Sequence, residues 1–180
     1  MSSSTPAPRG VVLVGYRGTG KSTVGRIVAA RLGRPFVDAD NALEARVGRS
    51  IRSIFEEDGE AAFRDHEEAV LADLTSRPGH VLATGGGAVL REANRAALKR
   101  FGLVVWLKAD PDVLAGRLRQ NQSGVSTRPA LTAAGTLGEI AEVLRVRTPF
   151  YRDVADVEVA TDGSTPEQVA EAVLSALDRQ

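Results

Sequence analysis

The sequence of 180 residues contains no cysteine, so the chain forms no disulfide, thiolate nucleophile or cysteine-ligated zinc site. Its 23 lysine and arginine residues balance 23 aspartate and glutamate residues, which leaves no net charge to attract nucleic acid or an anionic membrane. No apolar run approaches the roughly 18 residues that span a bilayer, and the opening MSSSTPAPRG has no apolar core of signal-peptide length. We therefore expect a cytoplasmic protein with a small-molecule partner, and no nucleic-acid or membrane partner.

The length of the chain and its apolar content of 43% fit one domain with a core of ordinary size. Residues 1–9 have almost nothing to bury, so they predict a disordered tail. Over residues 10–180, short apolar runs alternate with helical periodicity, which is typical of an α/β fold with a parallel sheet covered on both faces. Residues 119–135 interrupt this pattern with a polar, glycine-bearing segment, which we interpret as a mobile lid.

Periodicity predicts the first helix at 21–32, and the letters TPEQ predict the start of the last helix. In the first helix the apolar residues form one stripe, comprising Val24, Ile27, Val28 and Leu32. In the last helix Thr165 can cap, Pro166 suits the first turn and Gln168 closes a capping box. Trp106, in the apolar run LVVWLKAD, is most simply a core residue.

The stretch GYRGTGKS, from Gly15 to Ser22, satisfies the pattern G-x-x-x-x-G-K-[ST] and lies between an apolar run and a helical pattern. In such a loop, glycines let backbone N–H groups surround phosphate oxygens, the lysine neutralises the β- and γ-phosphates, and the hydroxyl binds Mg²⁺. The alternative is a glycine-rich turn with an incidental lysine. The pattern predicts that the chain binds a nucleoside triphosphate.

The rest of the sequence narrows the class of phosphate-loop protein. A guanine-reading Asn-Lys-x-Asp motif is excluded, because Lys99 and Lys108 each follow a leucine. A motor or helicase ATPase needs an apolar strand that ends in aspartate, which neither HVLATGGG nor VVWLKAD supplies. The nearest acids are Asp38 and Asp40, just after the second apolar run. We expect the chain to belong to neither of these classes.

Asp38 and Asp40 lie two residues apart, so in an extended segment both would face the same side, toward the phosphate loop. One carboxylate could serve the metal, and the other could orient and deprotonate the hydroxyl of a phosphoryl acceptor. The alternative is that Asp40 caps the helix that follows.

Two arginines lie on apolar helical stripes. Arg64 shares a helix face with Leu71 and Leu74, and Glu67, one turn on, can hold part of its guanidinium. Arg147 ends a second stripe, formed by Ile140, Val143 and Leu144. Two inward guanidinium groups suggest an anionic small molecule, although each could instead pair with a protein carboxylate or reach the surface along its stem.

Three glycines, Gly85 to Gly87, stand where the third apolar run ends. Residues without a Cβ suit a backbone that approaches a ligand closely or adopts positive φ. The alternative is an ordinary turn between a strand and a helix.

The segments GYRGTGKST, DAD, FRDHE, GGG, TRP and RTPFY, in this order, resemble the shikimate kinase family from about Val11 to Leu177. The resemblance implies a fold similar to nucleoside monophosphate kinases, with a five-stranded parallel sheet ordered 2-3-1-4-5. It also implies transfer of the γ-phosphoryl group of ATP to the 3-hydroxyl of shikimate, in the pathway to chorismate and the aromatic amino acids.

The resemblance also assigns roles to residues. It implies Lys21, Asp40 and Arg128 as catalytic residues, with Asp40 as the base. For ATP it implies contacts from the loop and the lid, namely Gly18, Thr19, Gly20, Lys21, Ser22, Thr23 and Arg128. For shikimate it implies contacts from Asp40, Arg64, Gly86 and Arg147. Mg²⁺ would bind Ser22 directly, with Asp38 assisting through water.

Two departures from the family pattern leave the residue that contacts adenine unassigned. Either Arg117 or Arg119 could match the arginine that the family often places against adenine, and the loop TDGSTPEQ lacks the arginine often found there. His66 and His80 match no motif of the family, and we expect them to be surface or neighbour-packed residues. Two other functions compete with shikimate phosphorylation: a kinase for gluconate or a nucleoside monophosphate, and a regulatory module that binds nucleotide without transfer. We expect a monomer.

Overall fold

The computed structural model describes residues 9–120 and 137–179. The proposed tail, apart from residue 9, and the proposed lid, apart from residues 119 and 120, therefore lie outside the described residues, and so does Arg128.

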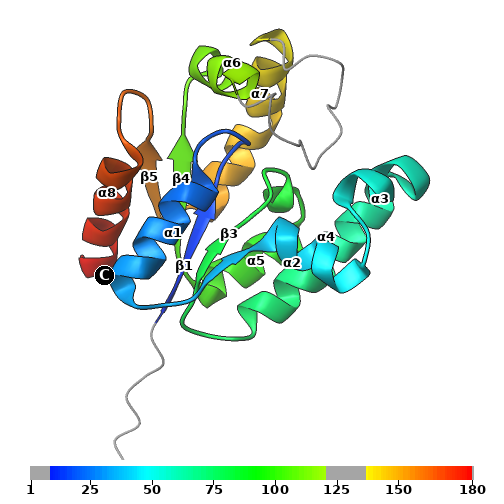
Figure 1. Cartoon of the computed structure of the whole chain (residues 1–180), viewed down its shortest axis with the longest axis horizontal. Helices are drawn as coiled ribbons and strands as arrows, with labels where there is room; N and C mark the ends of the chain where they lie inside the picture. Colours follow the sequence, from blue (N-terminus) through cyan, green and yellow to red (C-terminus); the bar gives the residue numbers. More distant parts are fainter. Residues whose placement is uncertain (1–8, 121–136, 180) are drawn as a thin grey trace, which may run out of the picture.

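The centre of the fold is a five-stranded sheet in which every neighbouring pair is parallel (Figure 1). Its order is β2-β3-β1-β4-β5, which confirms the order implied by the resemblance. The strands are β1 (Gly10–Val14), β2 (Phe36–Asp38), β3 (Val81–Ala83), β4 (Gly102–Lys108) and β5 (Val157–Ala160). All five residues of β1 are buried, as expected for the central strand of a sheet covered on both faces.

Helices α1 (Lys21–Leu32) and α8 (Pro166–Asp178) pack together against one face of the sheet. Their apolar side chains meet Val11 and Leu13 of β1. Val12 and Val14 point to the opposite face, because successive residues of a strand alternate between faces. The capping box of α8 is confirmed: the Thr165 hydroxyl accepts from Gln168 N–H, and the Gln168 side chain accepts from Thr165 N–H.

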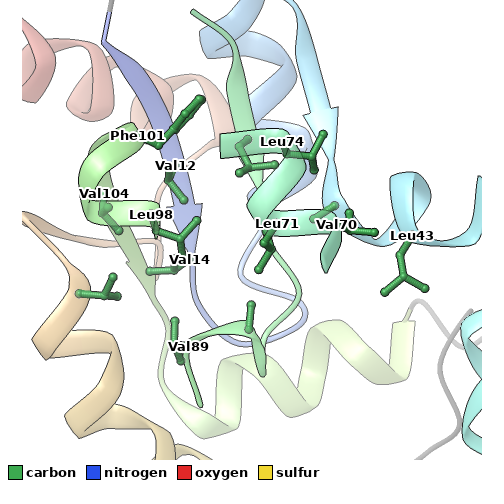
Figure 2. Close-up of a cluster of buried hydrophobic side chains, with 14 of the residues drawn as sticks. Val12, Val14, Leu43, Val70, Leu71, Leu74, Val89, Leu98, Phe101 and Val104 are labelled. Carbon is green, nitrogen blue, oxygen red and sulfur yellow. The ribbon is translucent and has the colours of Figure 1, made fainter. Parts of the chain in front are cut away.

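The opposite face is covered by a larger group of elements (Figure 1). They are α2 (Ala39–Val47), α3 (Ile51–Glu57), α4 (Gly59–Thr75), the 3₁₀ turn η1 (Ala88–Leu90), α5 (Glu92–Phe101) and α7 (Leu137–Val154). Figure 2 shows Val12 and Val14 of β1 among side chains of these elements, including Leu71 and Leu98. Helix α6 (Pro111–Gln120) packs on α7 beyond the end of β4.

Trp106 is a core residue, as expected: it is buried and stacks on Tyr151, with ring centroids 5.3 Å apart. His80 is packed against Phe101, with ring centroids 4.6 Å apart. Burial, followed by the nearby positive charge of Arg77, lowers the pKa of His80. Among the described residues no helix is long and apolar enough to cross a membrane.

Candidate active site

The phosphate loop joins the carboxyl end of β1 to the first residue of α1. Gly15, Gly18 and Gly20 adopt φ values of 144°, 83° and 90°, which only glycine adopts without strain. A Cβ on Gly15 would also strike the carbonyl oxygen of Leu107 at the end of β4. The loop therefore lies against the neighbouring strand, and the N–H groups at the start of α1 are available to phosphate.

Lys21 is almost fully buried, and its ammonium group stays with the loop. Nζ donates to the carbonyl oxygens of Gly15 and Tyr16, each at 2.8 Å. The hydroxyl of Thr19 also donates to the Tyr16 carbonyl, at 2.8 Å, whereas Thr23 is exposed on the first turn of α1. These contacts keep one compact positive charge next to the loop's backbone amides.

Ser22 and Asp38 bring an oxygen pair to the start of α1. The Ser22 hydroxyl donates to Oδ2 of Asp38 at 2.7 Å, and Oδ1 of the same carboxylate accepts from Asp40 N–H at 3.0 Å. A hydroxyl and a carboxylate are ligands that Mg²⁺ prefers, so this pair fits the metal expected there.

Asp38 and Asp40 do not lie on one extended segment, so the predicted extended geometry is wrong, although Asp38 does reach Ser22 next to the phosphate loop. Helix α2 begins at Ala39 because Asp38 is its N-cap, with a side chain that accepts from the N–H groups of Asp40 and Asn41. The alternative that Asp40 caps the helix is wrong for the same reason. Asp40 is instead half-buried in the first turn of α2.

Arg64 faces inward from α4, as its spacing predicted, and is 8% exposed. Its Nη1 lies 2.6 Å from Oε2 of Glu67, which is 3% exposed, and its Nη2 lies 3.2 Å from Oε1 of Glu60. The alternative that Arg64 pairs with protein carboxylates is therefore confirmed for Glu60 and Glu67. Such pairing fixes a planar guanidinium, which is the group best matched to a carboxylate.

The glycine turn between β3 and η1 lies against both arginines. A Cβ on Gly87 would overlap the guanidinium of Arg64, and a Cβ on Gly86 would lie 3.4 Å from Nη1 of Arg147. None of the three glycines has positive φ, so that part of the prediction is wrong. Gly87 must be glycine because the guanidinium of Arg64, from α4, occupies the space that a Cβ would need, whereas a Cβ on Gly86 would make only ordinary contacts.

The same turn adjoins the phosphate loop. The Cβ position of Gly86 is 3.4 Å from the Gly15 carbonyl oxygen and 3.5 Å from the Arg17 backbone nitrogen. Arg147 is half-buried on α7, in line with its predicted stripe. The loop for phosphate and two guanidinium groups for an anion therefore meet at one place in the fold.

The sequence did not predict the contacts that three residues make at this site, although Gly87 was expected in a closely approached turn and Arg117 was a candidate for the adenine contact. Gly87 makes room for Arg64, and the Tyr151 hydroxyl donates to the Gly86 carbonyl at 2.6 Å. Arg117 donates to the Gly18 carbonyl at 3.2 Å and to the hydroxyl and carbonyl of Thr161, each at 3.0 Å. Only Tyr151 left a usable signal, because it follows Arg147 by four residues and so shares its helix face.

Comparisons with known proteins agree with this geometry. The profile of the family described as Shikimate kinase matches residues 17–178. The chain is 41% identical to a shikimate kinase of Rhodopirellula baltica, over 98% of this chain and 94% of that protein. It is 44% identical to a shikimate kinase of Pseudomonas fluorescens, over 95% of each chain. The chain belongs to the shikimate kinase family.

Solved structures give the same result for the fold. The shikimate kinase of Acinetobacter baumannii, solved in complex with shikimate, has a TM-score of 0.88 and 37% identity, over 95% of this chain and 93% of that one. A gluconokinase of Sinorhizobium meliloti, at 20% identity and a TM-score of 0.61 over 97% and 94% of the two chains, shares the fold. The predicted fold class and family are thus confirmed.

Proposed function

We propose that this chain transfers the γ-phosphoryl group of ATP to the 3-hydroxyl of shikimate, which gives shikimate 3-phosphate and ADP for the synthesis of chorismate and aromatic amino acids. Membership of the shikimate kinase family supports this activity. The structural observation that carries the proposal is the position of Gly86, between the phosphate loop and Arg147. A phosphoryl donor and a carboxylate-bearing acceptor would then bind side by side.

On the nucleotide side, backbone N–H groups would hold the phosphates. They belong to Gly18, Thr19 and Gly20 of the loop and to Ser22 and Thr23 at the start of α1. Lys21 would follow the charge of the γ-phosphoryl group into the transition state. Arg128 would add a second cation from the lid, although it lies outside the described residues. The oxygen pair of Ser22 and Asp38 would hold Mg²⁺, Asp38 through water, and bound Mg²⁺ neutralises phosphate charge.

On the acceptor side, Arg64 and Arg147 would bind the carboxylate of shikimate beside Gly86. Asp40 would orient the 3-hydroxyl and accept its proton as the new oxygen–phosphorus bond forms. The bond between the γ-phosphorus and the β,γ-bridging oxygen breaks, and ADP leaves with those electrons. Binding both substrates next to each other converts a bimolecular reaction into an effectively unimolecular one.

A coupled assay of ADP release, with and without shikimate, tests the activity directly. We expect release to depend on shikimate, and gluconate and nucleoside monophosphates to be poor substitutes. A thermal-shift series with the same acceptors should rank shikimate first. Nucleotide binding without shikimate-dependent release would instead favour a regulatory module.

We further expect a monomeric cytoplasmic enzyme that acts without a nucleic-acid or membrane partner. The balance of charges and the lack of cysteine support this expectation. Size-exclusion chromatography with light scattering would measure the oligomeric state.

A further inference from the structure

The phenol of Tyr151 is a polar group in the interior of the fold. Tyr151 is 0% exposed, and its ring stacks on Trp106 behind the glycine turn. A buried tyrosine hydroxyl needs a hydrogen-bond partner, and this one donates to the Gly86 carbonyl at 2.6 Å. Apolar packing alone would have been served equally well by phenylalanine.

This hydrogen bond fixes one peptide group of the site. The described peptide bonds are trans, so the Gly86 carbonyl and the Gly87 N–H point in opposite directions. Because the carbonyl points to the phenol, the Gly87 N–H points away from Tyr151. Glycine leaves such a peptide free to rotate, and the phenol removes that freedom.

Helix α7 contacts Gly86 in two ways. Arg147 places Nη1 3.4 Å from the Cβ position of Gly86, and Tyr151, one turn later on the same face, binds its carbonyl. We propose that Tyr151 is a positioning residue for the acceptor, whose hydroxyl holds the Gly86–Gly87 peptide so that its N–H supplements the two arginines in binding the carboxylate of shikimate. The proposal rests on the proposed function and extends it to a residue that does not touch the substrate.

The substitution Tyr151→Phe isolates this hydroxyl. It keeps the ring and its stacking on Trp106, and α7 stays joined to η1 through Arg95, which donates to the carbonyls of Val89 and Leu90 and to Asp153. The variant is therefore expected to fold. Its effect should be confined to the orientation of one peptide.

We expect Tyr151→Phe to raise KM for shikimate about three- to tenfold, the effect of losing one hydrogen bond. KM for ATP should stay within twofold of the wild-type value. Calorimetry should show the same loss of shikimate affinity without turnover. With shikimate methyl ester, which lacks the carboxylate charge, the difference between wild type and variant should fall below twofold.

Thr84→Val is the matched control. Thr84 is 5% exposed, directly precedes the glycine turn and donates from its hydroxyl to the Leu13 carbonyl at 3.3 Å. This substitution also deletes a buried hydroxyl that binds a carbonyl, but not the one in the turn. It should lower Tm and leave KM for shikimate within twofold.

A lower Tm with an unchanged KM for shikimate in Tyr151→Phe would overturn the proposal, as would an equal rise in KM in Thr84→Val. These outcomes leave the proposed function intact, because wild type would still phosphorylate shikimate. Wild-type ADP release that does not depend on shikimate would overturn both.

Discussion

The nucleotide side and the acceptor side of the site are built differently. In the phosphate loop, Lys21 binds carbonyls six and five residues away, and Thr19 binds one three residues away. On the acceptor side, the bond from Tyr151 to Gly86 spans 65 residues, and the arginines come from α4 and α7. The nucleotide side is therefore a local motif, whereas the acceptor side depends on how helices pack. Substitutions on the two sides should therefore change different kinetic constants: KM for ATP or kcat on the nucleotide side, and KM for shikimate on the acceptor side.

The largest separation is expected from Lys21→Ala. It removes the compact cation of the loop, which stabilises charge on the transferred phosphoryl group, so kcat should fall by about 10³-fold. Calorimetric binding of shikimate should persist, since the acceptor side is held by other elements. Lys99→Ala, on exposed α5 surface, serves as the charge-matched control and should keep wild-type activity. Activity within tenfold of wild type in Lys21→Ala would contradict the role of the loop.

Asp40→Asn tests the proposed base between the two sides. The amide keeps the shape of the side chain but cannot accept the proton, so kcat should fall about 10²-fold, within the range of general-base contributions. KM for ATP should change little in a steady-state assay. The matched control is Asp73→Asn. It removes one negative charge from an exposed carboxylate that pairs with Arg77, so it should leave kcat unchanged. An unchanged kcat in Asp40→Asn would mean that the acid has no part in proton transfer.

Arg147→Lys tests whether the acceptor side needs the planar shape of a guanidinium as well as its positive charge. Lysine keeps the charge but loses the planar fork, so KM for shikimate should rise about tenfold while KM for ATP stays nearly constant. The methyl ester of shikimate removes the same interaction from the other partner, and should cost wild type about 2 kcal/mol or more. In a double cycle the two losses should be less than additive. Strict additivity would show that Arg147 does not bind the carboxylate.

The difference between the two sides also explains what the sequence could predict. The loop, the capping box of Thr165 and the inward face of Arg64 follow from spacing along one element, so they were predicted correctly. The geometry of Asp38 and Asp40 was wrong, because the N-cap of α2 depends on where the strand stops.

The missed contacts all join distant segments. The reason for glycine at Gly87 is the guanidinium of Arg64, which no local pattern places there. From the sequence, Arg117 is only a candidate for the adenine contact, because local spacing does not reveal its partners Gly18 and Thr161, which lie 99 and 44 residues away. Periodicity assigns a residue to a helix face, but packing decides which backbone that face meets.

The smallest effect is expected from a change at Arg117. This residue joins the phosphate loop, whose lysine and threonine contacts are local, to a distant segment. Its guanidinium joins the Gly18 carbonyl to Thr161, beyond the end of β5, so Arg117→Ala should loosen the loop and raise KM for ATP about three- to tenfold. KM for shikimate should remain within twofold in the same coupled assay. Arg77→Ala is the control, since Arg77 is exposed and its guanidinium binds Asp73, four residues earlier. If Arg117→Ala raised KM for both substrates equally, the two sides would be coupled through the loop and the division between them would not hold.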